Sequence, residues 1–317
     1  MTAPLVTLAD VHAARAAIAS RVRRTPMLRS TQLGERFGVD FHLKLEAFQK
    51  TGSFKVRGAL NRMLRLTADE KARGVIGVSA GNHAQAVAWA AHEVGTRATV
   101  VMYANAVKSK VEATKQYGGE VIQSERDLLE VAAELQSSRN LVMVHPFDDP
   151  AVIAGAGTVG DEILDDEPAA DLILVGVGGG GIVSGIAVAA KARRPAIRVI
   201  GVEPEGAAAM RLSLDRGSPQ RLASVSSIAD GLAAPWAGER TFEHVRALGV
   251  EIVTIPDAAI IEAMWLILER CKVLAEPAGA AGLGALLSGA VVAPKGSRVV
   301  CVVTGGNIDR ERLKTLV

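Results

Sequence analysis

The chain has 317 residues, 49% hydrophobic and 22% charged, a composition that can bury a large core and excludes a disordered chain. At about 150 residues per domain, this length favours two domains or one large α/β unit. The 36 lysines and arginines nearly balance the 34 aspartates and glutamates, and aromatic residues make up only 3%. With no polybasic run and few aromatics, we expect no nucleic-acid partner.

Cysteine usage and hydropathy bear on the compartment. Cys271 and Cys301 lie apart, without CxxC spacing, which predicts buried thiols in a reducing cytoplasm. Two uncharged segments, residues 172–190 and 277–294, have the length of membrane spans. Four consecutive glycines interrupt the first, and the second is mostly Ala and Gly. We therefore expect a cytoplasmic protein with no membrane partner.

In chain order, a leading helix is predicted to begin near Thr7 and to end before Thr25-Pro26. Short apolar runs then alternate with stretches of apolar spacing three and four. The runs predict strands at residues 41–45, 75–78, 98–102, 120–122, 141–144, 172–177, 198–202, 252–255 and 299–303. The stretches predict helices at residues 53–66, 82–94, 106–117, 126–136, 153–164, 182–192 and 258–271. Residues 217–238, which contain four Ser and two Pro, are predicted to be irregular.

This alternation of strands and helices predicts an α/β fold with largely parallel sheets. In such folds, ligands bind where loops leave the carboxyl ends of the strands. No linker separates the domains, and we expect the chain to change domain near residues 145–150.

A run of four glycines follows the predicted strand at 172–177 and precedes a helix, so its N–H groups can surround an anion. The run is not a Walker A loop, because no Gly-Lys-Ser/Thr follows. Gly176, Gly178 and Gly181 also satisfy G-x-G-x-x-G, and Glu203 ends the next predicted strand. A nicotinamide-dependent oxidoreductase using Gly176 to Glu203 is therefore one alternative, and a glycine turn needed only for packing is another.

Three further segments point to a different ligand. Lys44-Leu45-Glu46 leads to a segment containing Ser53-Phe54-Lys55, the run Ser79-Ala80-Gly81-Asn82-His83 opens a predicted helix, and Thr304 follows the last predicted strand. A glycine loop, an amide and a hydroxyl can hold a phosphate, a phenolic oxygen and a ring nitrogen. A lysine can add covalently to an aldehyde.

Together these segments resemble the fold-type II pyridoxal-phosphate enzymes, in particular the threonine/serine dehydratase and serine racemase branch, from Thr25-Pro26 to Asn307. The resemblance implies a fold like the tryptophan synthase β chain, with two open, mostly parallel, twisted sheets flanked by helices. It implies a large cofactor-binding domain of residues 1–67 and 148–317, a small domain of residues 68–147, and no C-terminal regulatory domain. It also implies a homo-oligomer, either a dimer or a tetramer.

The resemblance assigns residues to the cofactor, pyridoxal 5′-phosphate. Lys55 is the catalytic residue and forms the Schiff base, Phe54 lies against the ring, Asn82 bonds the phenolic oxygen, and Thr304 faces the ring nitrogen. The implied phosphate ligands are Gly178, Gly179, Gly180 and Gly181. The implied substrate-binding residues are Ser79, Ala80, Gly81, Asn82 and His83.

The resemblance also implies a cation site at Glu203 and the Ala207 carbonyl. Ala209 departs from the family pattern there by removing a side-chain ligand, which suits a monovalent cation better than Mg²⁺. The six histidines show no metal-ligand spacing. Glu276 either lies near the cofactor ring or is an ordinary acid at a helix N-terminus.

The implied reaction is α,β-elimination of a 3-hydroxy amino acid, by default L-threonine or L-serine, to a 2-oxo acid and ammonia. Phenylserine, 3-hydroxyaspartate and hydroxyectoine-derived substrates stay open, as do serine racemisation and a non-catalytic binding module. Ala80 occupies the position where related racemases have a serine that acts as the second acid/base. Since alanine has no transferable proton, we expect poor racemisation.

Overall fold

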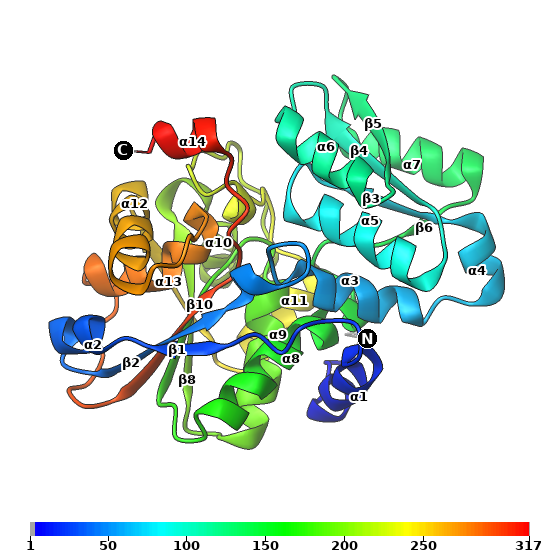
Figure 1. The fold of residues 1–317 in the computed structure, drawn as a ribbon. Coiled ribbons are helices and arrows are strands. Elements are labelled where there is room, and N and C mark those ends of the chain that lie inside the picture. The colour runs from blue at the N-terminus through cyan, green and yellow to red at the C-terminus, as the bar shows by residue number, and fades with distance from the viewer. Residues whose placement is uncertain (1–3, 317) are drawn as a thin grey trace.

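Two β-sheets organise residues 4–316, the part of the chain that this computed structural model describes (Figure 1). The strands are β1 (Met27–Arg29), β2 (Asp40–Leu45), β3 (Val75–Val78), β4 (Ala98–Tyr103), β5 (Glu120–Ser124), β6 (Val142–Met143), β7 (Leu172–Gly176), β8 (Arg198–Pro204), β9 (Glu251–Ile255) and β10 (Arg298–Val303). The six-stranded sheet has the order β1-β2-β10-β7-β8-β9, and only β1 pairs antiparallel to its neighbour. The four-stranded sheet has the order β5-β4-β3-β6 and is parallel throughout.

Helices cover both sheets. They are α1 (Leu8–Ile18), α2 (Thr31–Phe37), α3 (Lys55–Leu64), α4 (Ala68–Arg73), α5 (Asn82–Val94), α6 (Lys108–Gln116), α7 (Leu128–Arg139), α8 (Pro150–Asp166), α9 (Gly181–Arg193), α10 (Ala209–Arg216), α11 (Glu239–Ala247), α12 (Asp257–Leu266), α13 (Pro277–Leu287) and α14 (Arg310–Lys314). Short 3-10 turns lie at η1 (Glu46–Phe48), η2 (Glu205–Ala207) and η3 (Asp230–Leu232), and α12 continues as a π-helical turn, η4 (Ile267–Cys271). Among residues 4–316, no helix has the length and apolar character needed to cross a membrane.

The predicted α/β alternation with parallel sheets is confirmed, but several boundaries differ. Helix α8 begins three residues before its predicted start at residue 153, because Asp149 accepts hydrogen bonds from the Ala151 and Val152 N–H groups and Pro150 fits the first helical position. The elements β1, α2, α4, α10, α11, α13 and α14 were not predicted. Most of these are short, and α13 is built largely from Ala and Gly, which give little apolar contrast. Residues 217–238 hold only η3, as expected from their irregular sequence.

Alternation along the central strand explains why both faces of the large sheet are covered. Val299, Cys301 and Val303 of β10 join a core with α12 and α13, whereas Val300 and Val302 join a core with α8, α9 and α11. A strand buried on both faces is expected in a parallel sheet flanked by helices. The carboxyl ends of β7 and β10 therefore meet at one edge of this sheet.

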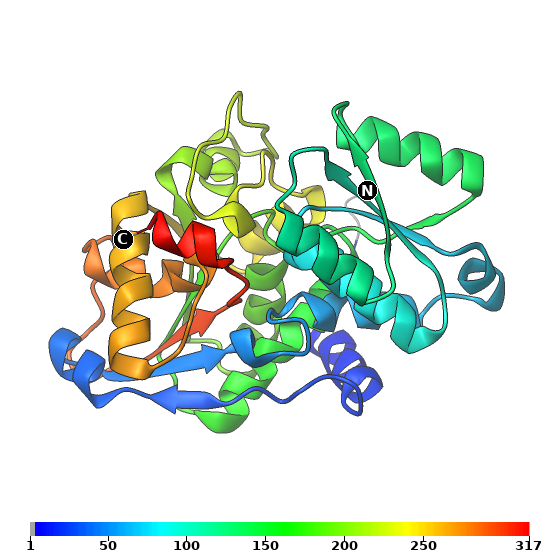
Figure 2. The same cartoon turned by 45° about the horizontal axis from the view of Figure 1, so that its top comes forward.

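Helix α3 lies between the two halves of the molecule. In both views the four-stranded sheet stands beside the six-stranded sheet (Figures 1 and 2). One side of α3 packs on α5, through an apolar core that includes Leu60 and Met63. The other side meets α8 backbone to backbone, since a Cβ on Gly155 would lie 2.5 Å from the Arg57 carbonyl oxygen. The four-stranded sheet uses residues 75–143, inside the predicted small domain of 68–147, and those domain limits stay a prediction.

Candidate active site

A cavity of about 610 Å³ lies at the carboxyl ends of β3, β7 and β10. Ligand sites in open α/β sheets occupy this position. The predicted site residues that line it are Phe54, Lys55, Ser79, Ala80, Gly81, Asn82, His83, Gly178, Gly179, Gly180, Gly181 and Thr304. Glu203 and Ala207 do not line it. Thus the residues predicted to bind the cofactor and the substrate gather at one place, and the two residues predicted to bind a cation lie elsewhere.

Lys55 is the first residue of α3, so its amine projects from the start of that helix. Its Nζ donates a hydrogen bond to the Pro146 carbonyl oxygen at 2.9 Å and stands 5.1 Å from the centre of the Phe54 ring. Burial lowers the pKa of Lys55 to about 8, while the nearby Glu276 carboxylate opposes that shift. A larger fraction of this amine is therefore neutral near pH 7 than for an exposed lysine.

Backbone contacts join the lysine loop, the residues Ser53 and Phe54 that precede Lys55, to the end of β10. The Phe54 N–H donates to the Thr304 carbonyl oxygen at 3.0 Å, and Ser53 forms an isolated β-bridge with Gly305. Thr304 is buried and lines the same cavity. These contacts set Lys55 and Thr304 on a common frame although 249 positions separate them (304 − 55 = 249).

A chain of three polar side chains closes one wall of the cavity. The Asn82 amide donates to Glu276 Oε1 at 2.5 Å, and Asn82 Oδ1 accepts from the Asn307 amide at 2.8 Å. The Asn307 amide also donates to the Thr51 carbonyl oxygen at 2.7 Å. Burial raises the pKa of Glu276 to about 7, against the lowering effect of its Asn82 hydrogen bond. The sequence leaves two roles open for Glu276 and indicates none for Asn307, although Asn307 lies in the run that follows β10.

The glycine run presents unused donors to the cavity. Gly180 precedes α9 at a φ of +95°, a conformation that glycine adopts without strain. In residues 4–316, no backbone or side-chain acceptor engages the N–H groups of Gly179, Gly180 and Gly181. A Cβ on Gly179 would lie 2.3 Å from the Phe147 ring, so this loop has no room for a side chain. Free N–H groups at a helix start form a site for a phosphate.

The segment from Ser79 to His83 begins α5. The Gly81 N–H donates to Ser79 Oγ at 3.1 Å, and Gly81 caps the helix without a side-chain hydrogen bond. His83 Nε2 lies 2.9 Å from the Val144 carbonyl oxygen. Burial, with a smaller contribution from Lys55, lowers the pKa of His83 to about 3, so the imidazole is neutral at physiological pH. In this structure the His83 ring links α5 to the end of β6.

Glu203 is fully buried and caps α10. Its two carboxylate oxygens accept hydrogen bonds from the N–H groups of Met210 and Arg211, each at 2.8 Å. Burial raises the pKa of Glu203 to about 7, and the two backbone hydrogen bonds oppose the shift. A carboxylate that binds the ribose of a nicotinamide cofactor should line the binding cavity. Glu203 does not line it, so the geometry offers no support for the nicotinamide alternative.

One further group of potential metal ligands occurs within residues 4–316, at Asp40, His42 and Glu167. Its carboxylates face arginines: Asp40 lies 2.7 Å from Arg29 Nε, and Glu167 lies 3.5 Å from Arg298 Nε. The positive charges already compensate the carboxylates, which disfavours binding of a cation. This group also lies outside the cavity.

Comparison with known proteins defines the class. Residues 18–305 match the family model described as pyridoxal-phosphate dependent enzyme. The chain is 42% identical over 316 residues to an L-threonine ammonia-lyase of Thermotoga maritima, covering 99% of this chain and 78% of the relative. It is 41% identical over 311 residues to a serine racemase of Oryza sativa subsp. indica, covering 95% and 91%. The solved structure of maize serine racemase superposes with a TM-score of 0.94 at 38% identity, covering 98% and 97%.

The chain therefore belongs to the pyridoxal-phosphate-dependent enzymes of fold type II. The cavity fits that cofactor: it offers a desolvated amine at Lys55, free N–H donors in the glycine run, an amide at Asn82 and a hydroxyl at Thr304. These groups match an aldehyde, a phosphate, a phenolic oxygen and a ring nitrogen respectively.

Proposed function

We propose that this protein is an ammonia-lyase that converts a 3-hydroxy amino acid, L-threonine or L-serine by default, into a 2-oxo acid and ammonia. The observation that carries the proposal is the cavity that combines Lys55, the glycine run and Ala80. It is supported by 42% identity to a protein named L-threonine ammonia-lyase over almost the full chain. When bound, the cofactor withdraws electrons from the substrate Cα and so weakens its C–H bond.

Several residues of the cavity have a task in this proposal. Lys55 would hold the cofactor through its amine, and its Nζ, when free, would accept the substrate Cα proton. The segment from Ser79 to His83 at the start of α5 binds the substrate carboxylate through N–H groups that are not already used, since those of Ser79 and Gly81 donate to the Val101 carbonyl and to Ser79 Oγ. Asn82 is held by Glu276 and Asn307 and would donate its remaining amide proton to the phenolic oxygen. Thr304 supplies a neutral partner for the ring nitrogen.

Serine racemisation is the second candidate, because some close relatives carry that name. Racemisation requires a proton donor on the face of the substrate opposite Lys55. Ala80, in the carboxylate-binding segment, has a methyl group that cannot donate a proton. We therefore place elimination ahead of racemisation.

Ammonia release from a panel of 3-hydroxy amino acids tests the proposal. The panel contains L-threonine, L-serine, phenylserine, 3-hydroxyaspartate and a hydroxyectoine-derived amino acid, with D-serine formation measured in parallel. We expect ammonia and a 2-oxo acid from at least one substrate, and neither from the Lys55→Ala variant, which should also lose the visible absorption of the holoenzyme. Absence of ammonia from every substrate, with the cofactor bound, would favour a binding module.

Four finer features belong to the same proposal. The large domain comprises residues 1–67 and 148–317, and the small domain comprises residues 68–147. A monovalent cation binds near Glu203 and Ala207, the protein forms a dimer or tetramer, and it acts in the cytoplasm. Chelation followed by addition of Na⁺, K⁺ or Mg²⁺ tests the cation, and light scattering measures the oligomeric state.

A further inference from the structure

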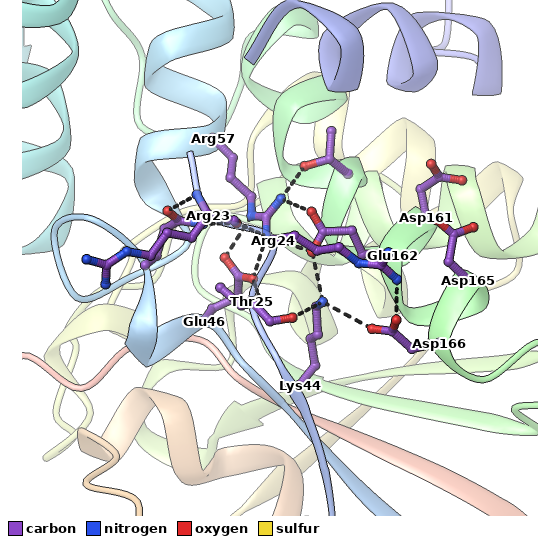
Figure 3. Close-up of polar contacts among 12 residues, drawn as sticks. Arg23, Arg24, Thr25, Lys44, Glu46, Arg57, Asp161, Glu162, Asp165 and Asp166 are labelled. Atoms are coloured by element: carbon purple, nitrogen blue, oxygen red, sulfur yellow. Dashed lines mark hydrogen bonds and ion pairs between the residues drawn. The ribbon is translucent and has the colours of Figure 1, made fainter. Parts of the chain in front are cut away.

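Four charged side chains form a buried network around Arg57, two residues after Lys55 (Figure 3). Lys44, Glu46, Arg57 and Glu162 are between 0% and 4% exposed. The Arg57 guanidinium donates paired hydrogen bonds to two carboxylates. Its Nε and Nη2 each donate to Glu46 at 2.8 Å, and its Nη1 and Nη2 donate to Glu162 at 2.7 and 2.9 Å.

The remaining donors and acceptors of the network are also satisfied. Arg57 Nη1 donates to Thr158 Oγ1 at 3.0 Å, and Lys44 Nζ lies 2.8 Å from Glu162 Oε2. The Thr25 hydroxyl donates to Glu46 at 2.5 Å, and the Thr25 carbonyl accepts from Lys44 at 2.7 Å. Lys44 also lies 3.6 Å from Asp166, which pairs with Arg24, so three positive and three negative charges cancel and the network is neutral.

Stability alone does not explain this arrangement. Burial of ion pairs is offset by the cost of desolvating each charge, and apolar replacements of similar volume are often as stable. Arg57 also stands in the first turn of α3, where the helix dipole disfavours a positive charge. Such a network instead fixes the relative positions of its side chains, because the planar guanidinium donates paired hydrogen bonds to a carboxylate in one orientation only.

The geometry that it fixes is the start of α3. Lys55 is in the same helical turn, two residues before Arg57, and α3 has no side-chain N-cap that would hold this turn. Gly58 and Gly155 set the distance between α3 and α8. The forked contacts of Arg57 to Glu46 and Glu162 then set the rotation of α3 and its position along its axis.

We propose that Arg57 is a positioning residue, whose contacts to Glu46, Glu162 and Thr158 hold the first turn of α3 so that Lys55 Nζ stands against Pro146 in the cavity. The inference rests on the proposed role of Lys55 but concerns this chain alone, so the cofactor-free protein can test it. The titratable groups that face Lys55 are Glu276, His83 and His145, and the test variants keep all three.

The test measures acetylation of Lys55 by acetic anhydride as a function of pH in the cofactor-free protein, with peptide mass mapping. Arg57→Lys keeps the charge but cannot form both forks. We expect its Lys55 titration midpoint to rise by at least about one pH unit from about 8, because the amine leaves Pro146 and gains water. In the holoenzyme, kcat should fall by about 10- to 100-fold with little change in KM.

Arg193→Lys is the matched control. Arg193 binds Asp161, the neighbour of Glu162 on α8, at 2.7 Å, and Asp161 is 1% exposed and is also held by Arg15. Arg193 and Arg15 come from α9 and α1, so the control makes the same substitution in a separate ion network, in which only Asp161 is buried. We expect no shift of the Lys55 midpoint in Arg193→Lys.

An unchanged midpoint in Arg57→Lys, or an equal shift in Arg193→Lys, overturns the proposal. If Arg57→Lys does not fold, Thr158→Val decides, because it removes one hydrogen bond to Arg57 and no charge. A rise of the midpoint in that variant supports the proposal, and an unchanged midpoint overturns it. Failure of the proposed function would give a different result. If the parent protein releases no ammonia but Arg57→Lys still shifts the Lys55 midpoint, the proposed activity is wrong and the positioning role of Arg57 stands.

Discussion

Glu276 offers a quantitative test of the cavity electrostatics. Its pKa is raised from the ordinary 4.5 to about 7 by burial. The pKa of Glu276 is higher in the folded than in the unfolded protein. Its contribution to the free energy of unfolding therefore falls as the pH rises from about 4.5 to about 7 and is constant above that. A shift of about 2.5 units corresponds to about 3 kcal/mol. Glu276→Gln removes this charge and keeps an oxygen that accepts from Asn82, so it should stabilise the cofactor-free protein by up to about 3 kcal/mol near pH 8.

Urea unfolding of the cofactor-free protein near pH 8 and near pH 5 measures the effect. Near pH 5 the folded carboxyl is protonated, so the gain from Glu276→Gln should be less than about 1 kcal/mol. Glu203→Gln is the control, because its pKa is also raised to about 7 but both of its oxygens accept backbone hydrogen bonds. That variant loses one of these bonds and should gain less. An equal gain for Glu276→Gln at both pH values would refute the reasoning.

Three more predictions concern the other parts of the chain. Ala80→Ser adds a hydroxyl that can donate a proton, so D-serine formation should rise by at least about tenfold; chiral chromatography showing no rise contradicts the assigned role. Gly179→Ala places a Cβ 2.3 Å from Phe147, so it should cost about 1–3 kcal/mol in thermal unfolding and weaken cofactor binding, and an unchanged cofactor titration argues against a phosphate site there. Glu203→Gln should abolish any activation by K⁺, and retained activation would move the proposed cation elsewhere.

The sequence predicts the parts of the molecule that short-range patterns encode. Apolar runs between helix-like stretches predict every strand except β1, and the glycine run and the Phe54-Lys55 pair, both predicted to bind the cofactor, line the cavity. In each case the chemistry lies in adjacent residues, at the end of a strand or the start of a helix. Local spacing is sufficient information for such features.

Contacts between distant residues were not predictable in this way. Glu276 meets Asn82 across 194 positions, and Arg57 meets Glu162 across 105. Nothing in the surroundings of any one of these residues indicates its partner, because the fold alone brings them together. The small helices α2, α4 and α14 were missed for a related reason: five to seven residues contain too few apolar positions to show a period.

The two sides of α3 differ in the kind of contact that they make. Toward α8 the contacts are directional, with forked hydrogen bonds from Arg57, a hydrogen bond of 2.7 Å from the Asn61 amide to the Ala151 carbonyl, and touching backbones. Toward α5 they are aliphatic, and such contacts impose no directional constraint. An opening of the cavity along the α3–α5 contact would also have to break the hydrogen bonds of Asn82 to Glu276 and Asn307. Lys55 would travel with the six-stranded sheet, and the carboxylate-binding segment would travel with the other.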